Sequence, residues 1–522
     1  MKKLAHALKS AFGEDAKADV NSNPVTLTVP VERFAEAAKT LKDGSAFLCA
    51  EWATDDTESG RGFCVYACLR EGGEYLIVKA EMSSEAAGPE FPSLVTHFVP
   101  AYRFERQIRS LMGIIPRGHP DGRPWIKFED WPEDAWPLRK SFDASKAMTC
   151  SEGQYLWLEA EGEGVYEIAV GPVHAGIIEP GHFRFQAVGE TIINLEERLG
   201  YVHKGIEKRF ESMTWETAVK LAGRVSGDTT VAHSTAYSMA LESMTHCHVP
   251  ERAQWLRALF IERERIANHL GDIGAICNDA AFAFMLYQCS RLKEAMMATN
   301  HRLFGHRFMM DRVIPGGVTV DISVDAKKEI LSELDFLDEN FNMLVRIYEE
   351  SSSLEDRVRS TGILTSKLAR ELCVVGIVAR ASGLDVDCRV HNTFPPYDSI
   401  GVNVPALTAG DVHARVWVRV FEIRESMRLL RRILKTIPSG SLFAHCNAVL
   451  PDTTGFAAVE GWRGEIIYWI KSGQQGEINR CMVRDPSSVN WLALEQAIKG
   501  NIVPDFPICN KSFNQSYSGH DL

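Results

Sequence analysis

The sequence predicts an α+β fold in which a small α/β module precedes a large, mainly α-helical domain. Three observations predict it. Short segments with alternating apolar residues, such as 62–69 and 73–82, occur in the first 110 residues and are typical of strands joined by hairpin turns. From about residue 188 onward, apolar residues recur every three or four positions, as in amphipathic helices. Between these regions, residues 155–174 form a second, short β region.

The composition is that of an ordinary globular protein. The 522 residues include 57 basic and 69 acidic side chains, a formal net charge of −12, with 45% hydrophobic and 24% charged residues. This balance excludes intrinsic disorder, and the length allows a large buried core in about two to four domains. The net negative charge disfavours a broad basic patch for nucleic acid or for an anionic membrane. We therefore expect no nucleic-acid partner.

Cysteine spacing and hydrophobic runs limit the cofactors and the location of the chain. The twelve cysteines contain no C-x-x-C pair, so the sequence predicts neither a zinc ribbon nor a ferredoxin-type cluster. No apolar run approaches the roughly 18 to 20 residues of a membrane-spanning helix. The first 20 residues lack the apolar core of a signal peptide. We expect free thiols in a reducing cytoplasmic compartment.

An irregular segment follows the first module. Residues 111–142 contain five prolines and several aromatic side chains, so neither the helical nor the strand period persists. We interpret residues 111–145 as an extended arm that is pinned by its aromatic side chains.

The helical region is expected to begin near residue 188, because Ile192, Leu195, Leu199, Val202 and Ile206 recur every three or four positions. Further helices are predicted over 215–245, 252–271, 280–305, 325–352, 365–382 and 412–436. Most of the C-terminal two-thirds should therefore be a helical bundle.

One predicted helix, over residues 225–241, is polar without being charged. Its single formally charged side chain is Asp228, so we expect burial on most sides. A solvated face is one explanation of its polar residues, but exposed helix faces are normally built from Lys, Glu and Arg. A polar stripe on a buried helix favours an internal cavity, where it can bind a ligand or relay protons. The stripe consists of Ser226, Thr230, His233 and Tyr237.

Several motifs resemble one protein family, the large subunits of membrane-bound group 4 [NiFe] hydrogenases and the D subunit of respiratory complex I. The motifs occur in the same order as in that family. They are GPVHAGIIEPGHFRFQAVGETIINLEERLGYVHKGIEK at 171–208, RAQWLRALFIERERIANH at 252–269, IPGGV at 314–318, RASGLDVDCR at 380–389 and VEGWRGE at 459–465. Residues 118–140 resemble the end of the complex I C subunit, whose tail clasps the D subunit. The resemblance implies a fusion of a C-subunit-like domain, 1–145, with a hydrogenase large-subunit or D-subunit-like domain, 146–522.

The resemblance also implies that the metal site has been lost. The hydrogenases hold nickel and iron with four cysteine thiolates, from an R-x-C-G-x-C motif and a C-terminal D-P-C-x-x-C motif. Here Ser226 and Thr229 stand in the first two cysteine positions, and SYSGHDL places His520 near the third. We therefore expect no metal in this chain, and a true hydrogenase is the least favoured function.

Individual residues take roles from the same resemblance. Glu179 matches a proton-transfer glutamate, Tyr237 a quinone-binding tyrosine, and His233 the histidine after the cysteine pair. Asp279 matches an aspartate that partners a quinone-site histidine, and Arg463 an arginine over the metal site. The further candidates for acceptor binding are His174, His182, Ser226 and Thr230.

Structural alternatives exist for these residues. His174 and His182 could bond the backbone of their loop, and Asp279 could cap a helix. Glu179, which precedes a proline, could be a turn residue, and Arg463 could pair with a structural carboxylate.

The function that the resemblance implies is that of the large subunit of a complex I-like membrane oxidoreductase, of the NADH- or ferredoxin-quinone type. Its pocket would bind a quinone-like acceptor and transfer protons, coupled to proton translocation. This chain would bind no cofactor, because the iron–sulfur cluster would belong to a partner small subunit similar to the complex I B subunit. Membrane antiporter-like and anchor subunits would complete a complex on the cytoplasmic face of the inner membrane. The alternative is a non-catalytic scaffold or coupling subunit with an empty pocket.

Overall fold

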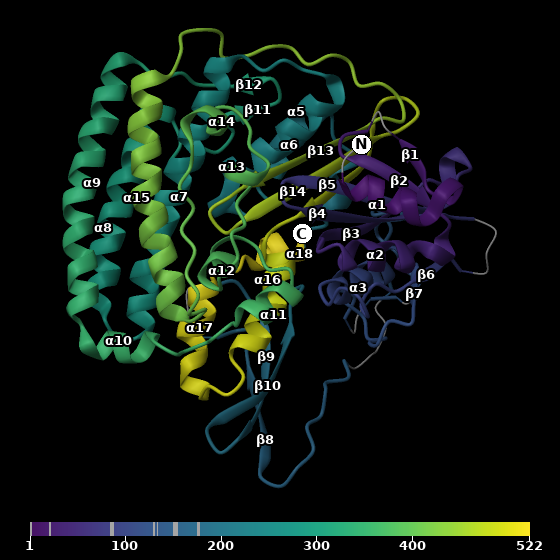
Figure 1. The fold of residues 1–522 in the computed structure, drawn as a ribbon, viewed down its shortest axis with the longest axis horizontal. Helices are drawn as coiled ribbons and strands as arrows, with labels where there is room; N and C mark the ends of the chain where they lie inside the picture. The colour runs from purple at the N-terminus through teal and green to yellow at the C-terminus, as the bar shows by residue number, and fades with distance from the viewer. Residues whose placement is uncertain are drawn as a thin grey trace.

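The computed structural model describes residues 3–19, 22–83, 88–128, 131–132, 134–149, 155–174 and 178–522. Residues 129–130 and 133 of the predicted arm, and residues 175–177 of the loop before Glu179, lie outside the described residues. The fold is α+β, as predicted, with a front module, a small projecting sheet and a large helical body (Figure 1). No helix in the described part of the chain combines the length and the apolar character needed to cross a bilayer.

The front module is a five-stranded sheet with helices on one face. The strand order is β1-β2-β5-β4-β3, and all neighbours are antiparallel except β2 and β5. The predicted strands at 62–69 and 73–82 are confirmed as β4 and β5. The elements are α1 (Lys3–Phe12), β1 (Lys17–Asp19), β2 (Val25–Val29), α2 (Phe34–Asp43), β3 (Phe47–Asp55), β4 (Phe63–Glu71), β5 (Glu74–Met82), β6 (Glu90–Pro92), α3 (Ala101–Met112) and β7 (Ile115–Arg117).

The second face of this sheet packs on the large domain. Trp52 and Tyr66 stack with ring centroids 5.2 Å apart, and Trp469 of the large domain lies within 5.3 Å of both rings. Trp469 belongs to a three-stranded sheet of β13 (Thr454–Glu460), β14 (Glu465–Ser472) and β15 (Ile478–Arg484). The two sheets therefore share an aromatic core that joins the front module to the large domain.

The described part of the arm lies along the large domain. Trp125 is 3% exposed and belongs to a core cluster of the large domain. The guanidinium groups of Arg103 and Arg106, both on α3, lie 5.2 and 5.0 Å from its ring. Farther along, Lys208 donates a hydrogen bond to the carbonyl of Arg139 at 3.0 Å. Aromatic and cationic contacts thus hold the arm in place.

The prediction that helices begin near residue 188 is wrong. The chain there belongs to an antiparallel sheet of β8 (Val165–Val170), β9 (His182–Val188) and β10 (Thr191–Arg198). A bulge between Ile192 and Asn194 interrupts the β9–β10 register. The extra residue puts Ile192 and Leu195 both on the buried side, although they are three positions apart. The spacing of buried residues in this bulged strand is therefore the same as in a helix. This sheet projects from the body in Figure 1.

The long helices predicted for the large domain are confirmed, with two interruptions. The predicted helix at 215–245 is divided by a turn of 3₁₀ helix at Gly227–Thr229, and the one at 365–382 consists of two short helices. Four long helices, α7, α8, α9 and α15, lie side by side at one edge of the molecule, opposite the front module (Figure 1). The long helices are α6 (Thr230–Thr245), α7 (Glu251–Asp279), α8 (Ala283–Phe304), α9 (Val324–Glu350) and α15 (Val412–Thr436).

Shorter elements complete the large domain. They are α4 (Ile206–Phe210), α5 (Trp215–Ala222), β11 (Val313–Ile314), β12 (Gly317–Val318), α10 (Ser352–Val358), α11 (Ser366–Glu371), α12 (Gly376–Ala381), α13 (Cys388–His391), α14 (Tyr397–Ile400), α16 (Ser487–Ala497), α17 (Phe506–Phe513) and α18 (Tyr517–Asp521).

Helix α6 is buried between the three-stranded sheet and α7. A Cβ at Gly455 would lie 2.1 Å from the carbonyl oxygen of Ala240, so glycine permits the close approach of β13 to α6. At the other end of the helix, the Glu264 carboxylate of α7 accepts hydrogen bonds from the amides of Val231 and Ala232, at 2.7 and 3.1 Å. Burial raises the pKa of Glu264 to about 8, although these two amides oppose the shift. Glu264 thereby caps α6 from a neighbouring helix.

We expect Glu264→Ala to destabilise the start of α6, because two buried amides lose their acceptor, at a cost of about 1–3 kcal/mol. Hydrogen exchange of the Val231 and Ala232 amides measures this directly and should become faster. Glu294→Ala is the matched control, since Glu294 is an exposed carboxylate paired with Arg307 on the surface. Unchanged exchange at both amides in Glu264→Ala would contradict this role.

Candidate functional site

A polar cavity of about 840 Å³ lies where the C-terminal segment meets α7 and the segment that precedes α6. Its wall comes from segments that are far apart in the sequence, including the turn between β13 and β14. Hydroxyl and amide side chains line it together with six charged side chains, Glu179, Asp228, Asp272, Lys293, Arg463 and Lys511.

Arg463 ties three of these segments together. Its guanidinium donates two hydrogen bonds to the Asp228 carboxylate, at 2.8 and 2.7 Å, and a third to the carbonyl of Asn514 at 2.6 Å. It lies 3.9 Å from the ring of its neighbour Trp462. Burial acts to raise the pKa of Asp228, but the charge and hydrogen bonds of Arg463 outweigh it and hold that pKa well below its usual value. The pair is therefore ionised at neutral pH.

Serine hydroxyls meet beside this ion pair. The Ser226 and Ser516 hydroxyls lie 2.8 Å apart, and Ser226 also donates to Asp228 at 2.8 Å. Ser516 begins α18 and accepts a hydrogen bond from the amide of Gly519 at 2.9 Å. The start of α18 and the turn before α6 therefore form one hydrogen-bonded wall.

Glu179 is the carboxylate on the exposed side of this cavity. It follows the loop that the sequence singled out and accepts a hydrogen bond from the amide of Ser518 at 3.0 Å. It lies outside helices and strands, as the turn interpretation expected, and it also lines the cavity. The two interpretations of Glu179 are therefore compatible.

His233 lies one layer behind the cavity wall. Its Nε2 is 3.1 Å from the Asp485 carboxylate and its Nδ1 is 3.0 Å from the Tyr468 hydroxyl, and all three side chains are buried. Burial acts to raise the pKa of Asp485, but its hydrogen bond to His233 and the charges nearby lower it overall. A Cβ at Gly519 would lie 2.7 Å from Asp485, so this carboxylate adjoins the serine wall. Asp485 therefore connects His233 to the cavity.

Tyr237 and Thr230 are buried away from the cavity. The Tyr237 hydroxyl donates to the carbonyl of Trp215 at 2.9 Å, and its ring stacks on Phe210. Of the predicted stripe, Ser226 alone lines this cavity. The expectation of one continuous helix face is wrong, because Ser226 has an extended backbone and the 3₁₀ turn at Gly227–Thr229 separates it from α6.

The remaining candidates also lie outside the cavity wall. His182 bonds the carbonyl of Gly171 through Nδ1 at 3.0 Å, as its structural alternative expected, and burial lowers its pKa. The Nε2 atoms of His182 and His174 are buried without a partner in the described part of the chain. Asp279 is exposed and ends α7, whereas α8 begins after Phe282, so the helix-cap alternative is wrong.

Comparison with known proteins identifies the family. The model of the respiratory-chain NADH dehydrogenase 49 Kd subunit matches residues 272–454 and 443–521, and that of the 30 Kd subunit matches residues 27–148. Hydrogenase-4 component G of Escherichia coli is 31% identical over 527 residues, covering 99% of this chain and 91% of the relative. The chain belongs to the complex I C/D and hydrogenase large-subunit family.

Other members of this family cover similar lengths. Formate hydrogenlyase subunit 5 of Escherichia coli is 30% identical, over 95% of this chain and 89% of the relative. The C/D subunit of the NADH-quinone oxidoreductase of Phocaeicola vulgatus is 28% identical, over 85% and 90%. Among solved structures, a chain of the membrane-bound sulfane sulfur reductase, an archaeal respiratory membrane complex, superposes with a TM-score of 0.66 and 25% identity. The superposition covers 70% of this chain and 100% of the reductase chain. This structural relative is thus part of a respiratory membrane complex.

The structure corrects one position in the thiolate motifs of this family. His520 points away from the serine wall, packing against Trp125 with its Nδ1 2.8 Å from Asp521. Ser516 lies beside Ser226 instead, and Ser516 and Gly519 have the spacing of a C-x-x-C pair. Ser226, Thr229, Ser516 and Gly519 thus have the spacing of the two cysteine pairs that the resemblance implies.

This set of residues does not fit a nickel–iron centre. Three hydroxyls and a hydrogen replace four thiolates, and a serine or threonine hydroxyl is not ionised near neutral pH. The crowding of Gly519 by Asp485 also leaves no room for a larger side chain. Among the residues that the structure describes, no group of three or more His, Cys, Asp or Glu side chains could hold a metal ion.

Because the Tyr237 hydroxyl is buried and hydrogen-bonded, we expect it to contribute to the stability of the fold. Tyr237→Phe removes a hydroxyl that satisfies the Trp215 carbonyl, so the free energy of unfolding should fall by about 1 kcal/mol. Tyr287→Phe is the matched control, because Tyr287 is 70% exposed. Thermal unfolding of the purified protein tests both variants. A midpoint for Tyr237→Phe equal to that of the control would contradict a structural role of this hydroxyl.

Proposed function

We propose that this chain is the large subunit of a membrane-bound, complex I-like oxidoreductase in which the nickel–iron position has become a polar reaction pocket. The observation that carries the proposal is the cavity of about 840 Å³ beside Ser226 and Ser516, with ionisable side chains in its wall. Burying polar groups without a ligand or water is unfavourable, so a site without function is expected to fill with apolar side chains. The polar wall supports continued use of the pocket.

The pocket would bind a quinone-like acceptor and deliver its protons. Two-electron reduction of a quinone to a quinol consumes two protons, which the carboxylate of Glu179 is placed to exchange with solvent. Arg463 faces the cavity and would hydrogen-bond an acceptor oxygen, while Ser226 would line the pocket beside it. His233 would act through Asp485, as a proton-holding group behind the wall.

In this proposal the electrons come from a partner. An iron–sulfur small subunit similar to the complex I B subunit would carry the cluster, and membrane antiporter-like and anchor subunits would use the proton uptake. The complex would lie on the cytoplasmic face of the inner membrane. The relatives support membrane partners in general, since they include a subunit of a membrane-bound hydrogenase and a chain of a respiratory membrane complex.

A non-catalytic coupling subunit is the second candidate. One observation favours it: the polar atoms of His233 and of Tyr237 are all bonded within the protein, so neither residue directs a free group into the cavity. In that case the pocket would hold only water, and the chain would transmit structural changes between its partners.

Substitution of the cavity carboxylate separates the two candidates. Glu179→Gln keeps the size and the hydrogen bond to Ser518 but cannot exchange a proton, so we expect acceptor-dependent electron transfer to fall by about 10²-fold. Glu190→Gln is the matched control, because Glu190 is an exposed glutamate in the turn between β9 and β10. Rates are measured in membranes and normalised to assembled complex. A Glu179→Gln rate equal to that of the control, with normal assembly, would contradict the reaction pocket and favour the coupling subunit.

A further inference from the structure

Two cysteines far apart in the sequence meet outside the protein core. Among the cysteines that the structure describes, all are buried except Cys247 and Cys446, which are both partly exposed. Cys247 follows the end of α6, and Cys446 lies in the irregular segment that precedes β13. Two segments that are far apart in the sequence thus each carry a partly exposed cysteine.

Hydrogen bonds hold the two segments in register on either side of this pair. The thiol of Cys247 contacts the carbonyl of Ala444 at 3.9 Å, and the Asn447 side chain donates to the carbonyl of Thr245 at 2.7 Å. Cys446 lies between Ala444 and Asn447 in this frame, which brings its side chain next to that of Cys247. Burial and the neighbouring Cys247 side chain raise the pKa of Cys446 to about 12, so the Cys446 thiol keeps its proton at neutral pH.

A second cavity gives small molecules access to the pair. It has a volume of about 410 Å³ and is separate from the polar pocket, with no lining residue in common among those described. Cys247 is part of its wall, together with Met239, His246, His248 and Phe394. A reagent of modest size can therefore reach the sulfur of Cys247 without unfolding of the chain.

We propose that Cys247 and Cys446 form a reversible disulfide when the protein meets a small oxidised disulfide, such as glutathione disulfide. The Cys247 thiolate attacks one sulfur of the reagent, which breaks the reagent's S–S bond and releases one glutathione thiolate. The Cys446 sulfur then attacks Cys247, releases the second glutathione thiolate and closes the protein disulfide. The protein loses two electrons and two protons in total, and the two glutathione molecules that are released carry them.

The cross-link would tie an element behind the wall of the polar pocket to a segment that leads to the wall itself. Helix α6 carries His233, and the segment of Cys446 leads through β13 to Arg463. Oxidation would join these elements covalently at their far ends. In a reducing compartment such a disulfide is transient and suits redox sensing. This inference does not depend on the identity of the acceptor.

Peptide mass analysis tests the proposal on the assembled complex. After incubation with glutathione disulfide and alkylation of the remaining thiols under denaturing conditions, we expect one linked pair of peptides that contains Cys247 and Cys446. Its mass should be lower by two hydrogens than the sum of the free peptides, and dithiothreitol should abolish it. Alkylation of both cysteines in the treated wild type, or a stable glutathione adduct on either, would overturn the proposal.

Serine variants show whether the second cysteine closes the bond. Cys446→Ser should retain glutathione on Cys247, because no thiol remains to displace it. Cys289→Ser is the matched control, since Cys289 is a buried residue of α8, and it should give the same linked peptides as the wild type. Absence of the adduct from Cys446→Ser would show that Cys247 is not the attacking thiol and would overturn the proposed sequence of steps.

Discussion

The pocket depends on the guanidinium of Arg463, which binds the segment before α6 and the C-terminal segment at the same time. Without it, the partly buried Asp228 carboxylate would lose its charged partner, which is strongly unfavourable. The backbone around Arg463 is equally constrained, since a Cβ at Gly376 would lie 1.9 Å from the Arg463 carbonyl oxygen. One arginine in a glycine-rich turn therefore joins the same two segments that the Ser226–Ser516 hydrogen bond connects.

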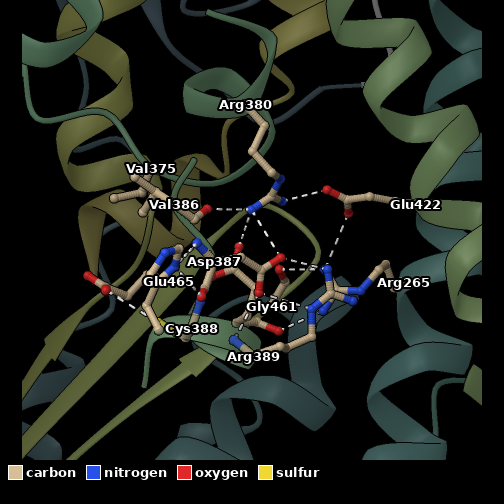
Figure 2. Close-up of polar contacts among 12 residues, drawn as sticks. Arg265, Val375, Arg380, Val386, Asp387, Cys388, Arg389, Glu422, Gly461 and Glu465 are labelled. Carbon is tan, nitrogen blue, oxygen red and sulfur yellow. Dashed lines mark hydrogen bonds and ion pairs between the residues drawn. The ribbon is translucent and has the colours of Figure 1, made fainter. Parts of the chain in front are cut away.

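A network of buried charges extends from this pocket toward the front module. It begins at the cavity residue Asp272, which binds Arg419 of α15. Three residues farther along the same helix, Glu422 binds Arg380, as Figure 2 shows. Farther along, Cys388 donates to Glu465 at 3.3 Å, and Glu465 accepts from Tyr75 of the front module at 2.5 Å. Buried ion pairs of this kind add little net stability, but they require specific partners. The fusion of the two modules is therefore specified by polar contacts as well as by its aromatic core.

The sequence allowed a correct prediction of the fold class and of the long helices, because α7, α8, α9 and α15 have unbroken helical periods. It failed where a local irregularity changed the period, as at the bulge in β10 and the 3₁₀ turn before α6. The strands β13–β15, which are buried on both faces, gave no alternating pattern. Glu179, Ser226 and Arg463 were found as cavity residues, whereas Asp485, Ser516 and Asp272 were missed, because tertiary contacts alone bring them to the site.

Metal analysis is the most direct test of the proposed replacement of the thiolates of a nickel–iron centre by hydroxyls and a glycine. The assembled complex would be purified from cells grown with added nickel, and its nickel content measured by inductively coupled plasma mass spectrometry, normalised to this chain. The proposed function predicts iron from an iron–sulfur partner subunit, and no stoichiometric nickel is expected because Ser226, Thr229, Ser516 and Gly519 offer no soft ligand. Nickel near one atom per chain would contradict the account.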